Sequence, residues 1–265
     1  MADPITSVQN PRIKNLVLLQ QKSRERRRQN RVVVEGLRET AIAVANGFNI
    51  CEFYVCPEIA DVHDYKKVAG EAPVTVVSQN VFEKLAYREG SDGCIALLEP
   101  RWLKLEDVKL RNNPLVIILE AVEKPGNLGA ILRTADAADV DAVIVCDPLT
   151  DIYNPNVIRS GVGCVFSRQV VACSTDEAQK WLKDKEIKSY AAELKASAPY
   201  HQFNYQNPTA FVMGTEADGL TAKWIDFCDK RVIIPMLGSI DSLNVSVSTA
   251  VLVFEAMRQR EFRVI

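Results

Sequence analysis

The sequence predicts an α/β protein built from two domains, with strands and helices alternating in each. The chain has 265 residues, and an average domain has about 100–200. Hydrophobic residues make up 48% and charged residues 25% of the chain, which is typical of globular proteins. Short apolar segments alternate with segments of helical periodicity in both halves. We place the two domains at residues 1–105 and 106–265.

The first domain is expected to begin with a helical segment over residues 10–31, in which an apolar stripe including Ile13 and Leu16 lies opposite basic side chains. Strands are then expected at residues 32–34, 51–55, 74–77 and 94–98, with helical segments near 38–46 and 79–86. Together these elements describe a small α/β unit. Residues 99–113 are expected to form a linker with a short helical patch at 102–110.

Positive charge is concentrated in the first 40 residues. They contain nine Lys and Arg against four Asp and Glu, a local charge of +5, so with −2 for the whole chain the other 225 residues carry −7. Such a basic face attracts a nucleic-acid backbone, although a solvated helix surface would show the same pattern. If RNA is the partner, the side chains expected to contact its phosphates are Arg12, Lys14, Arg24, Arg26, Arg27 and Arg28.

The second domain is expected to contain a parallel sheet. Strands are predicted at residues 115–121, 142–146, 165–171, 188–191, 209–213 and 231–234, and helices at 128–138, 175–184 and 243–260. Continuously apolar strands such as residues 115–119 are typical of a parallel sheet with helices on both faces. Ligands of such sheets bind beyond the carboxyl ends of the strands. The residues that follow each strand are therefore the candidates for a site.

The first strand-to-helix junction of this domain is polar. Pro125 and Gly126 turn the chain after the strand, and Asn127 is suited to cap the following helix. Arg133 lies six residues after Asn127, which is less than two helical turns. We expect both side chains to border one cleft at the strand ends.

Two later junctions also carry polar residues. The strand at 209–213 ends at Gly214, which would let a backbone approach a ligand, although a plain turn before a helix at 221 explains the same residues. The strand at 231–234 ends at Pro235, and a helix is expected to begin near Ser242. Ser and Asn at positions 242, 244, 246 and 248 exceed what capping requires. This density indicates a polar site.

Three segments at these junctions resemble, in order, the three motifs of the SpoU family of RNA ribose 2′-O-methyltransferases. They read Lys-Pro-Gly-Asn-Leu-Gly-Ala-Ile-Leu-Arg-Thr-Ala from residue 124, Gly-Thr-Glu-Ala-Asp-Gly-Leu from 214, and Ile-Pro-Met-Leu-Gly-Ser-Ile-Asp-Ser-Leu-Asn-Val-Ser-Val-Ser from 234. Residues 7–14 and 33–36 look like the family's substrate-binding N-terminal domain. The chain departs from the family at Lys124, where relatives often have an acidic residue, and at Ala217, where many have glycine.

The resemblance implies a C-terminal α/β domain folded as a trefoil knot. The loops of the second and third motifs would hold S-adenosylmethionine, largely through backbone groups. The cofactor-binding residues that it implies are Gly214, Ile234, Met236, Gly238 and Leu243. It also implies a homodimer with the active site at the subunit interface, and RNA as the substrate, with ribosomal RNA favoured over transfer RNA.

By the same resemblance, Arg133 acts beside the ribose hydroxyl, which must lose its proton as the new bond forms. A guanidinium holds its proton too strongly to be a free base. Stabilising negative charge on the oxygen and anchoring a phosphate are therefore the favoured roles. Asn127 would orient Arg133 or the ribose, and Glu216, Ser242 and Asn244 would complete a polar pocket.

Other classes of protein fit less well. Residues 161–163 lack the third glycine of a dinucleotide-binding fingerprint, and the chain contains no Gly-x-Ser-x-Gly segment of a serine hydrolase. A non-catalytic RNA-binding protein on the same fold stays the alternative. Seven scattered cysteines and two histidines predict reduced thiols and no metal site. The chain shows neither a signal peptide nor an apolar run of membrane-spanning length, so we expect a cytoplasmic protein.

Overall fold

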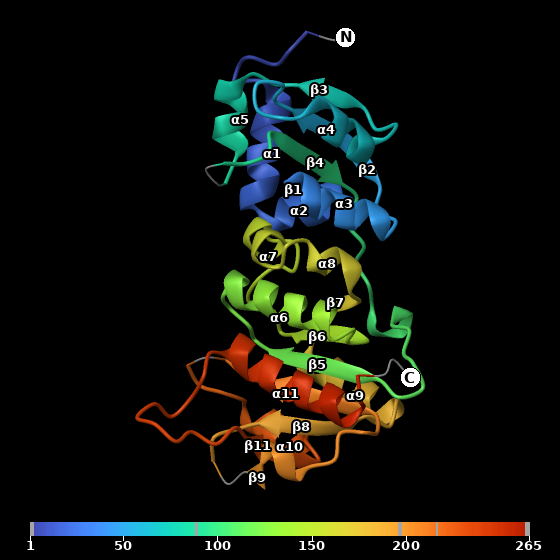
Figure 1. Cartoon of the computed structure of the whole chain (residues 1–265), viewed down its shortest axis with the longest axis vertical. Coiled ribbons are helices and arrows are strands. Elements are labelled where there is room, and N and C mark those ends of the chain that lie inside the picture. Colours follow the sequence, from blue (N-terminus) through green and yellow to red (C-terminus); the bar gives the residue numbers. More distant parts are fainter. Residues whose placement is uncertain (1–2, 88–89, 196–197, 216, 263–265) are drawn as a thin grey trace. The chain divides into compact units, whose positions relative to one another are not determined.

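The computed structural model describes residues 3–87, 90–195, 198–215 and 217–262, with the helices and strands labelled in Figure 1. The chain divides into two compact units. Unit 1 comprises residues 1–101 and 153–167, and unit 2 comprises residues 102–152 and 168–265. The boundary predicted at residue 105 for the functional domains stays a prediction.

Unit 1 contains a four-stranded sheet in the order β1-β4-β2-β3 among the described residues. Strands β1 (Val32–Glu35) and β2 (Ile50–Val55) both pair antiparallel with β4 (Cys94–Leu98), and β3 (Val74–Val76) pairs parallel with β2. Helices α1 (Pro11–Gln21) and α5 (Gln79–Leu85) bury apolar side chains such as Ile13 and Phe82 in the core of this unit. The other helices of its first segment are α2 (Ser23–Gln29), α3 (Leu37–Ala45) and α4 (Val62–Ala69).

Unit 2 contains a sheet in which every strand pair is parallel, as the sequence predicts. The order of the described strands is β7 (Val170–Cys173), β6 (Ala142–Cys146), β5 (Leu115–Glu120), β10 (Thr209–Met213), β8 (Lys188–Ala192), β11 (Lys230–Ile233) and β9 (Ala198–Pro199). Strands β5 and β10 are buried at every position. The continuous apolar runs in the sequence therefore correspond to the middle of the sheet.

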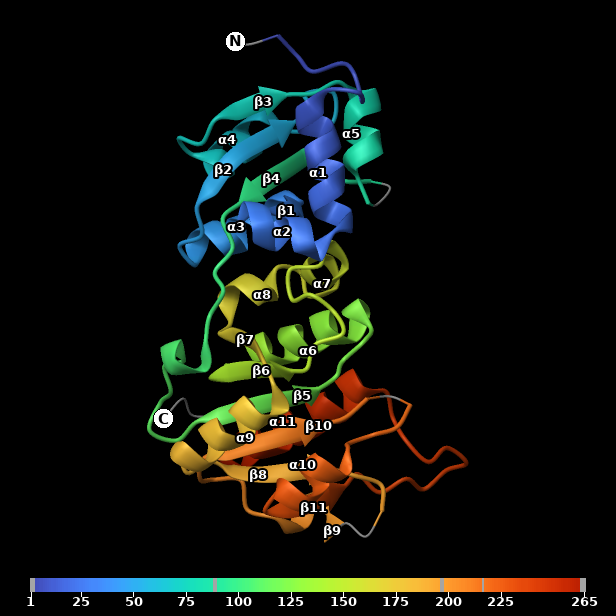
Figure 2. The ribbon, with the colours of Figure 1, turned by 180° about the vertical axis from the view of Figure 1, so that it is seen from behind.

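Helices cover both faces of this sheet, which confirms the prediction (Figures 1 and 2). Helices α6 (Pro125–Ala137) and α11 (Val245–Gln259) pack against each other on one face. Helices α9 (Thr175–Asp184) and α10 (Ala222–Phe227) cover the other face, where Trp181 and Trp224 join a buried cluster with Val116 and Ile118 of β5. The carboxyl ends of the strands are left as the edge where a ligand can bind.

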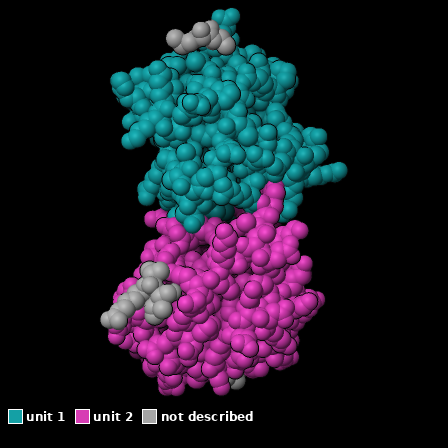
Figure 3. Space-filling view, turned by 90° about the vertical axis from the view of Figure 1, so that its right-hand side faces the viewer, with its two compact units in different colours: residues 1–101, 153–167 teal, residues 102–152, 168–265 magenta. Residues whose placement is uncertain are grey.

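The segment 153–167 belongs to unit 1, shown in teal in Figure 3. It forms two short helices, α7 (Pro155–Ser160) and α8 (Cys164–Ser167), which pack on β1 and α3. The sequence predicts a strand at 165–171, and this prediction is wrong for residues 165–169, since α8 ends at Ser167 and β7 begins only at Val170. An apolar run this short has no periodicity that distinguishes a helix from a strand.

Other predicted boundaries also shift. The helical segment expected over residues 10–31 breaks at Lys22, whose backbone is extended (φ −120°, ψ 109°). The helical patch expected at 102–110 is only a 3₁₀ turn at Leu105–Asp107. Helices α4 and α7 and strand β9 are not predicted at all. Each is short, so its apolar pattern is too brief to recognise.

All seven cysteines are free thiols, as predicted. Burial raises the pKa of the Cys94 and Cys228 thiols to about 12, and that of Cys56 to about 11, with an added contribution from the Glu58 side chain at Cys56. These thiols stay protonated and unreactive at neutral pH. None of the helices in the described part of the chain is long and apolar enough to cross a membrane.

Candidate active site

A cleft of about 750 Å³ opens at the carboxyl edge of the sheet in unit 2. Small-molecule sites usually have volumes of about 300–1,000 Å³. The cleft is lined by the residues that follow β8, β10 and β11, together with the first turns of α11. These segments converge because the carboxyl ends of parallel strands meet at one edge. The cleft therefore lies where the sequence predicts a ligand site.

The segment after β10 forms a tight turn that is one wall of the cleft. The backbones of Thr215 and Gly219 exchange two hydrogen bonds, of 3.0 and 3.1 Å, and Gly219 has a φ of +70°. A Cβ atom at Gly214 would overlap the backbone of Gly219. A glycine is thus required at position 214 because the backbone of Gly219 lies so close to it. The sequence predicts instead that Gly214 allows close approach to a ligand.

A buried carboxylate fastens this turn to the sheet. Glu120, the last residue of β5, is 5% exposed. It accepts hydrogen bonds from the backbone N–H (2.8 Å) and the hydroxyl (2.6 Å) of Thr221, which is the N-cap residue of α10. The sequence analysis missed this role of Glu120. Its position at the carboxyl end of a predicted strand is the signal that could have found it.

The start of α11, which also lines the cleft, joins residues of two predicted motifs. Asn244 is the N-cap residue of α11, and its Oδ1 accepts from the backbone N–H (2.9 Å) and hydroxyl (2.6 Å) of Ser246. Its Nδ2 donates to Oδ1 of Asn127 (3.2 Å). The predicted capping role of Asn127 is wrong, because the N-cap of α6 is Lys124. Asn127 instead links the starts of α6 and α11.

Arg133 lies on an exposed side of α6 and is not among the residues that line the cleft. At 3.6 residues per turn, six residues separate Arg133 from Asn127 by about 120° around the helix and about 9 Å along it. Within the described part of the chain, Arg133 forms no hydrogen bond or ion pair. The two side chains therefore leave α6 in different directions, and only Asn127 contacts a residue of the cleft.

The other predicted residues are distributed as follows. Gly214, Ile234, Met236 and Leu243 of the predicted cofactor set, and Ser242 and Asn244 of the predicted catalytic set, line the cleft. Gly238 lies in the exposed loop after β11 and is not among the lining residues. Glu216 lies outside the described residues. The roles assigned to all of them stay predictions.

The sequence analysis missed a polar segment that lines the cleft directly after β8, namely Glu193 and Lys195. A search after the strand predicted at 188–191 would have found it. No group of three or more His, Cys, Asp or Glu side chains suited to a metal ion occurs among the residues described.

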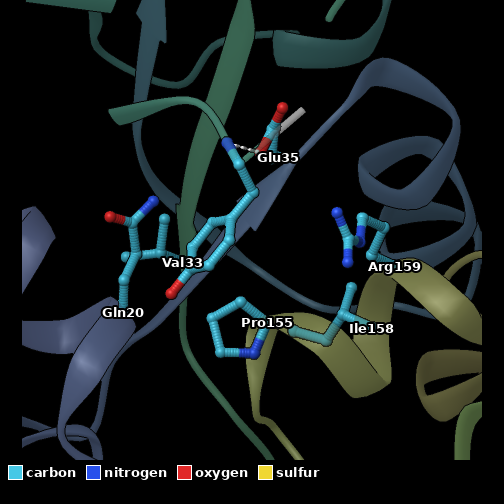
Figure 4. Close-up of a pocket in the computed structure, with 7 residues that line it drawn as sticks. Gln20, Val33, Glu35, Pro155, Ile158 and Arg159 are labelled. Carbon is cyan, nitrogen blue, oxygen red and sulfur yellow. Dashed lines mark hydrogen bonds between the residues drawn. The ribbon is translucent and has the colours of Figure 1, made fainter. Parts of the chain in front are cut away.

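A second, narrow cavity lies within unit 1 and is shown in Figure 4. Its lining residues are Gln20, Val33, Glu35, Tyr87, Pro155, Ile158 and Arg159. The backbone N–H of Tyr87 donates a 2.7 Å hydrogen bond to Glu35 across it. Its volume of about 10 Å³ is enough for about one water molecule. The cleft of unit 2 is therefore the candidate active site.

The prediction that Arg26 contacts RNA is wrong. Arg26 is 2% exposed, and its Nη1 donates to the carbonyl oxygens of Leu19 (2.7 Å) and Gln20 (3.1 Å). These carbonyls belong to the last turn of α1, where helical partners are missing. The guanidinium therefore stabilises the break between α1 and α2 and does not face solvent.

The other five basic residues predicted to contact RNA are exposed. Arg12 forms an ion pair with Glu52 and donates a 2.6 Å hydrogen bond to the Thr75 hydroxyl. Arg28 is paired with Glu25 on the same helix (2.6 Å). The predicted RNA contacts that are exposed all lie in helices α1 and α2. They form the basic segment of unit 1, namely Arg12, Lys14, Arg24, Arg27 and Arg28.

Comparison with known proteins identifies the family. The model of the SpoU rRNA Methylase family matches residues 114–254, and that of the MRM3-like substrate binding domain matches residues 10–96. A crystal structure of an RNA 2′-O ribose methyltransferase is 38% identical, with a TM-score of 0.87 over 98% of this chain and 100% of that one. The AdoMet-bound rRNA methyltransferase from Sinorhizobium meliloti is 27% identical, with a TM-score of 0.87 over 97% of both chains.

A curated relative shows the same likeness along the chain. The 23S rRNA (guanosine(2553)-2′-O)-methyltransferase RlmP of Bacillus subtilis is 29% identical over 94% of this chain and 97% of its own length. The SpoU model alone covers more than half of this chain. The chain is therefore a member of the SpoU rRNA methylase family, with a substrate-binding domain in front of the methyltransferase domain.

Proposed function

We propose that this chain transfers a methyl group from S-adenosylmethionine to the 2′-hydroxyl of a ribose in RNA. The observation that carries the proposal is the cleft of about 750 Å³ at the carboxyl edge of unit 2, whose walls are formed by the segments of the second and third motifs. Membership in the SpoU family supports the reaction class. The convergence of the two segments supports a common binding site for the methyl donor.

The cleft fits S-adenosylmethionine in size and in chemistry. Residues 234–243 lie outside helices and strands, so their backbone groups are available to a ligand. Met213, Ile225 and Leu252 supply apolar surface that suits an adenine ring. The methyl donor supplies an activated methyl group when it is bound. The chain has to bind it and to hold the ribose hydroxyl in line with that group.

Asn127 and Asn244 are suited to orient the RNA nucleotide. Their mutual hydrogen bond of 3.2 Å fixes both side chains. The Nδ2 atom of Asn127 is buried and has no hydrogen-bond partner in the described structure. A buried donor without a partner costs about 1–3 kcal/mol, and a nucleotide oxygen would satisfy it. Correct positioning of the reacting groups contributes about 7–11 kcal/mol in well-oriented systems.

Arg133 is proposed to act on the oxygen that loses its proton. A guanidinium beside this oxygen stabilises the negative charge that develops in the transition state. Its exposed position on α6 also suits an RNA phosphate. Both roles require the RNA to approach the exposed side of α6.

A second copy of the chain is proposed to complete the site. Helix α11 exposes Val247 (47%) and Phe254 (40%), seven residues apart on one face, and the loop before it exposes Leu237 (100%) and Ile240 (61%). Contiguous exposed apolar side chains of this kind mark interaction surfaces. Because α6 packs beside α11, a copy bound here would lie next to Arg133. A sedimentation measurement that finds only monomers at micromolar concentration would remove this part of the proposal.

The segments of the second and third motifs, which contain the predicted cofactor-binding residues, are also proposed to be threaded as a trefoil knot. Such knots are rare among protein folds. The sheet order supports it, because β10 lies between β5 and β8 although it follows both in sequence. The strand leading into the third motif, β11, lies on the other side of β8.

Ribosomal RNA is the proposed substrate, and the cytoplasm the proposed compartment. The 23S rRNA relative matches 94% of this chain, so the likeness includes the substrate-binding unit as well as the methyltransferase unit. An enzyme with a separate substrate-binding domain can recognise RNA structure at a distance from the reacting ribose.

The proposed function is tested by methyl transfer from tritiated S-adenosylmethionine to RNA from cells that lack the protein. We expect label in RNA that survives alkaline hydrolysis as a dinucleotide, because a 2′-O-methyl group blocks cleavage. Mapping 2′-O-methyl marks in cells with and without the protein then identifies the nucleotide. Binding of RNA without transfer of label would instead favour a non-catalytic RNA-binding protein.

The basic segment of unit 1 gives a separate prediction about RNA affinity. Replacing both Arg24 and Arg27 with Gln is expected to weaken RNA binding and to flatten its salt dependence. The slope of log K against log salt should fall by about 0.7–0.9 for each phosphate that the variant no longer neutralises. The control replaces Lys180 and Lys185 of unit 2, which are also exposed, with Gln. Equal slopes for both double variants would show that α2 is only a solvated surface.

A further inference from the structure

Glu193 occupies a distinctive place in the cleft. It follows β8 directly, and its backbone N–H donates a 3.0 Å hydrogen bond to the carbonyl oxygen of Val232 in β11. This bond holds residue 193 between the carboxyl ends of two neighbouring strands. Its side chain is among those that line the cleft.

The carboxylate of Glu193 retains unused capacity to accept hydrogen bonds. The side chain is 15% exposed, and its Oε2 atom is buried without a hydrogen-bond partner among the residues described. The Nε of Arg231 lies 3.8 Å from Oε2. That distance gives charge attraction but no hydrogen bond. Buried carboxylate oxygens normally have hydrogen-bonding partners, so this carboxylate has acceptor capacity to spare, and its partial exposure leaves it open to a ligand that supplies donors.

Among the described residues, two other carboxylates line the cleft, Asp218 and Asp241, and both differ from Glu193. Both are exposed to solvent. Asp241 also accepts a 3.1 Å hydrogen bond from the hydroxyl of Ser242. Among the described lining residues, Glu193 is therefore the carboxylate with an oxygen, Oε2, that is shielded from water and has no hydrogen-bond partner.

The surroundings of Glu193 favour neutral donors over a cationic one. Arg231 already opposes its charge, and Lys195 also lines the cleft two residues further on. An ammonium group would therefore meet two cations. Ala192, Leu194 and Val232 beside it are apolar and suit a nucleoside. Two adjacent hydroxyls match a carboxylate without adding charge, as in other α/β sheets where an acidic side chain binds a ribose.

We propose that Glu193 binds the ribose of the methyl donor, with its carboxylate accepting hydrogen bonds from the 2′- and 3′-hydroxyls of the adenosyl group. This role rests on the proposed function. It makes Glu193 a determinant of cofactor binding that acts independently of RNA. It also separates this residue from Asn127 and Arg133, whose proposed roles concern the RNA substrate.

Calorimetric titration of the purified full chain tests the proposal without a turnover assay. The probe is 5′-methylthioadenosine, which keeps the ribose and lacks the amino-acid part of the cofactor. Glu193→Ala should weaken its binding about tenfold to a hundredfold, the usual range for a hydrogen bond to a charged group. Glu193→Gln keeps one acceptor oxygen and should retain part of the affinity. The 2′-deoxy probe should bind the wild type more weakly and be nearly insensitive to Glu193→Ala.

Asp226→Asn is the matched control, since Asp226 is also 3.8 Å from Arg231 but does not line the cleft. It should leave binding of the probe unchanged. Unchanged affinity in Glu193→Ala overturns the proposal, and so does a loss confined to S-adenosylhomocysteine, which would assign the carboxylate to the amino group. If the Glu193 variants do not fold, equal wild-type affinities for the probe and its 2′-deoxy form overturn it. A wild type that binds no adenosyl compound contradicts the proposed function itself.

Discussion

Replacement of Arg133 with Ala is expected to lower the rate of methyl transfer about a hundredfold to a thousandfold, the usual effect of removing one group that stabilises a developing oxyanion. Affinity for S-adenosylmethionine should stay within about twofold, because Arg133 does not line the cleft. Single-turnover transfer of tritium to RNA measures the rate, and calorimetry measures the affinity. The two measurements separate a role at the ribose from a role in the cofactor site.

Two further variants make the Arg133 prediction specific. Arg133→Lys keeps the charge but loses the planar, forked donor arrangement, so it should recover only part of the rate. Lys180→Ala removes an exposed basic side chain of α9, on the other face of the sheet, and it should transfer methyl groups normally. Near-normal turnover of Arg133→Ala would remove this residue from the mechanism.

Replacement of Gly214 with Ala is expected to abolish measurable binding of the cofactor. The added Cβ atom overlaps the backbone of Gly219, and backbone is much harder to displace than a flexible side chain. Overpacking of this kind costs about 1–3 kcal/mol. The two hydrogen bonds between Thr215 and Gly219 would have to lengthen, which moves one wall of the cleft. Calorimetric titration with S-adenosylhomocysteine and a thermal unfolding curve measure both effects.

Gly126→Ala is the matched control for Gly214→Ala. A Cβ atom at Gly126 meets nothing within 4 Å, and the residue lies in the first turn of α6. It should bind the cofactor normally and be at least as stable as the wild type, because Ala favours the helix. If Gly214→Ala bound the cofactor as tightly as Gly126→Ala, the turn at 214–219 would not be a wall of the cofactor site.

The sequence allowed the parallel sheet and the position of the cleft to be predicted, because both follow from local patterns. Strands β5 and β10 are apolar except for one terminal residue each, which only burial on both faces explains. Polar and glycine residues then follow these strands, at the edge where parallel sheets bind ligands. The separate α/β unit at the start of the chain followed from the same alternation of strands and helices.

Features that depend on tertiary packing were not predictable in this way. Arg26 belongs to a run of basic residues, and its burial follows from the helix break at Lys22, which exposes the carbonyls that it binds. Val165 and Phe166 belong to helix α8, which packs on α3, although their sequence fits a strand equally well. Glu193 follows a predicted strand and so was open to prediction as a residue of the ligand edge, but its hydrogen bond to Val232 depends on the pairing of β8 with β11.

The walls of the cleft have a consequence for biosynthesis. The described residues that line the cleft all lie between Ala192 and Leu252. If the cleft binds the methyl donor as proposed, a chain still being translated completes this site only after Leu252 has left the ribosome. The substrate-recognising unit is largely synthesised long before that point. Nascent chains would therefore meet RNA first and acquire the ability to modify it last.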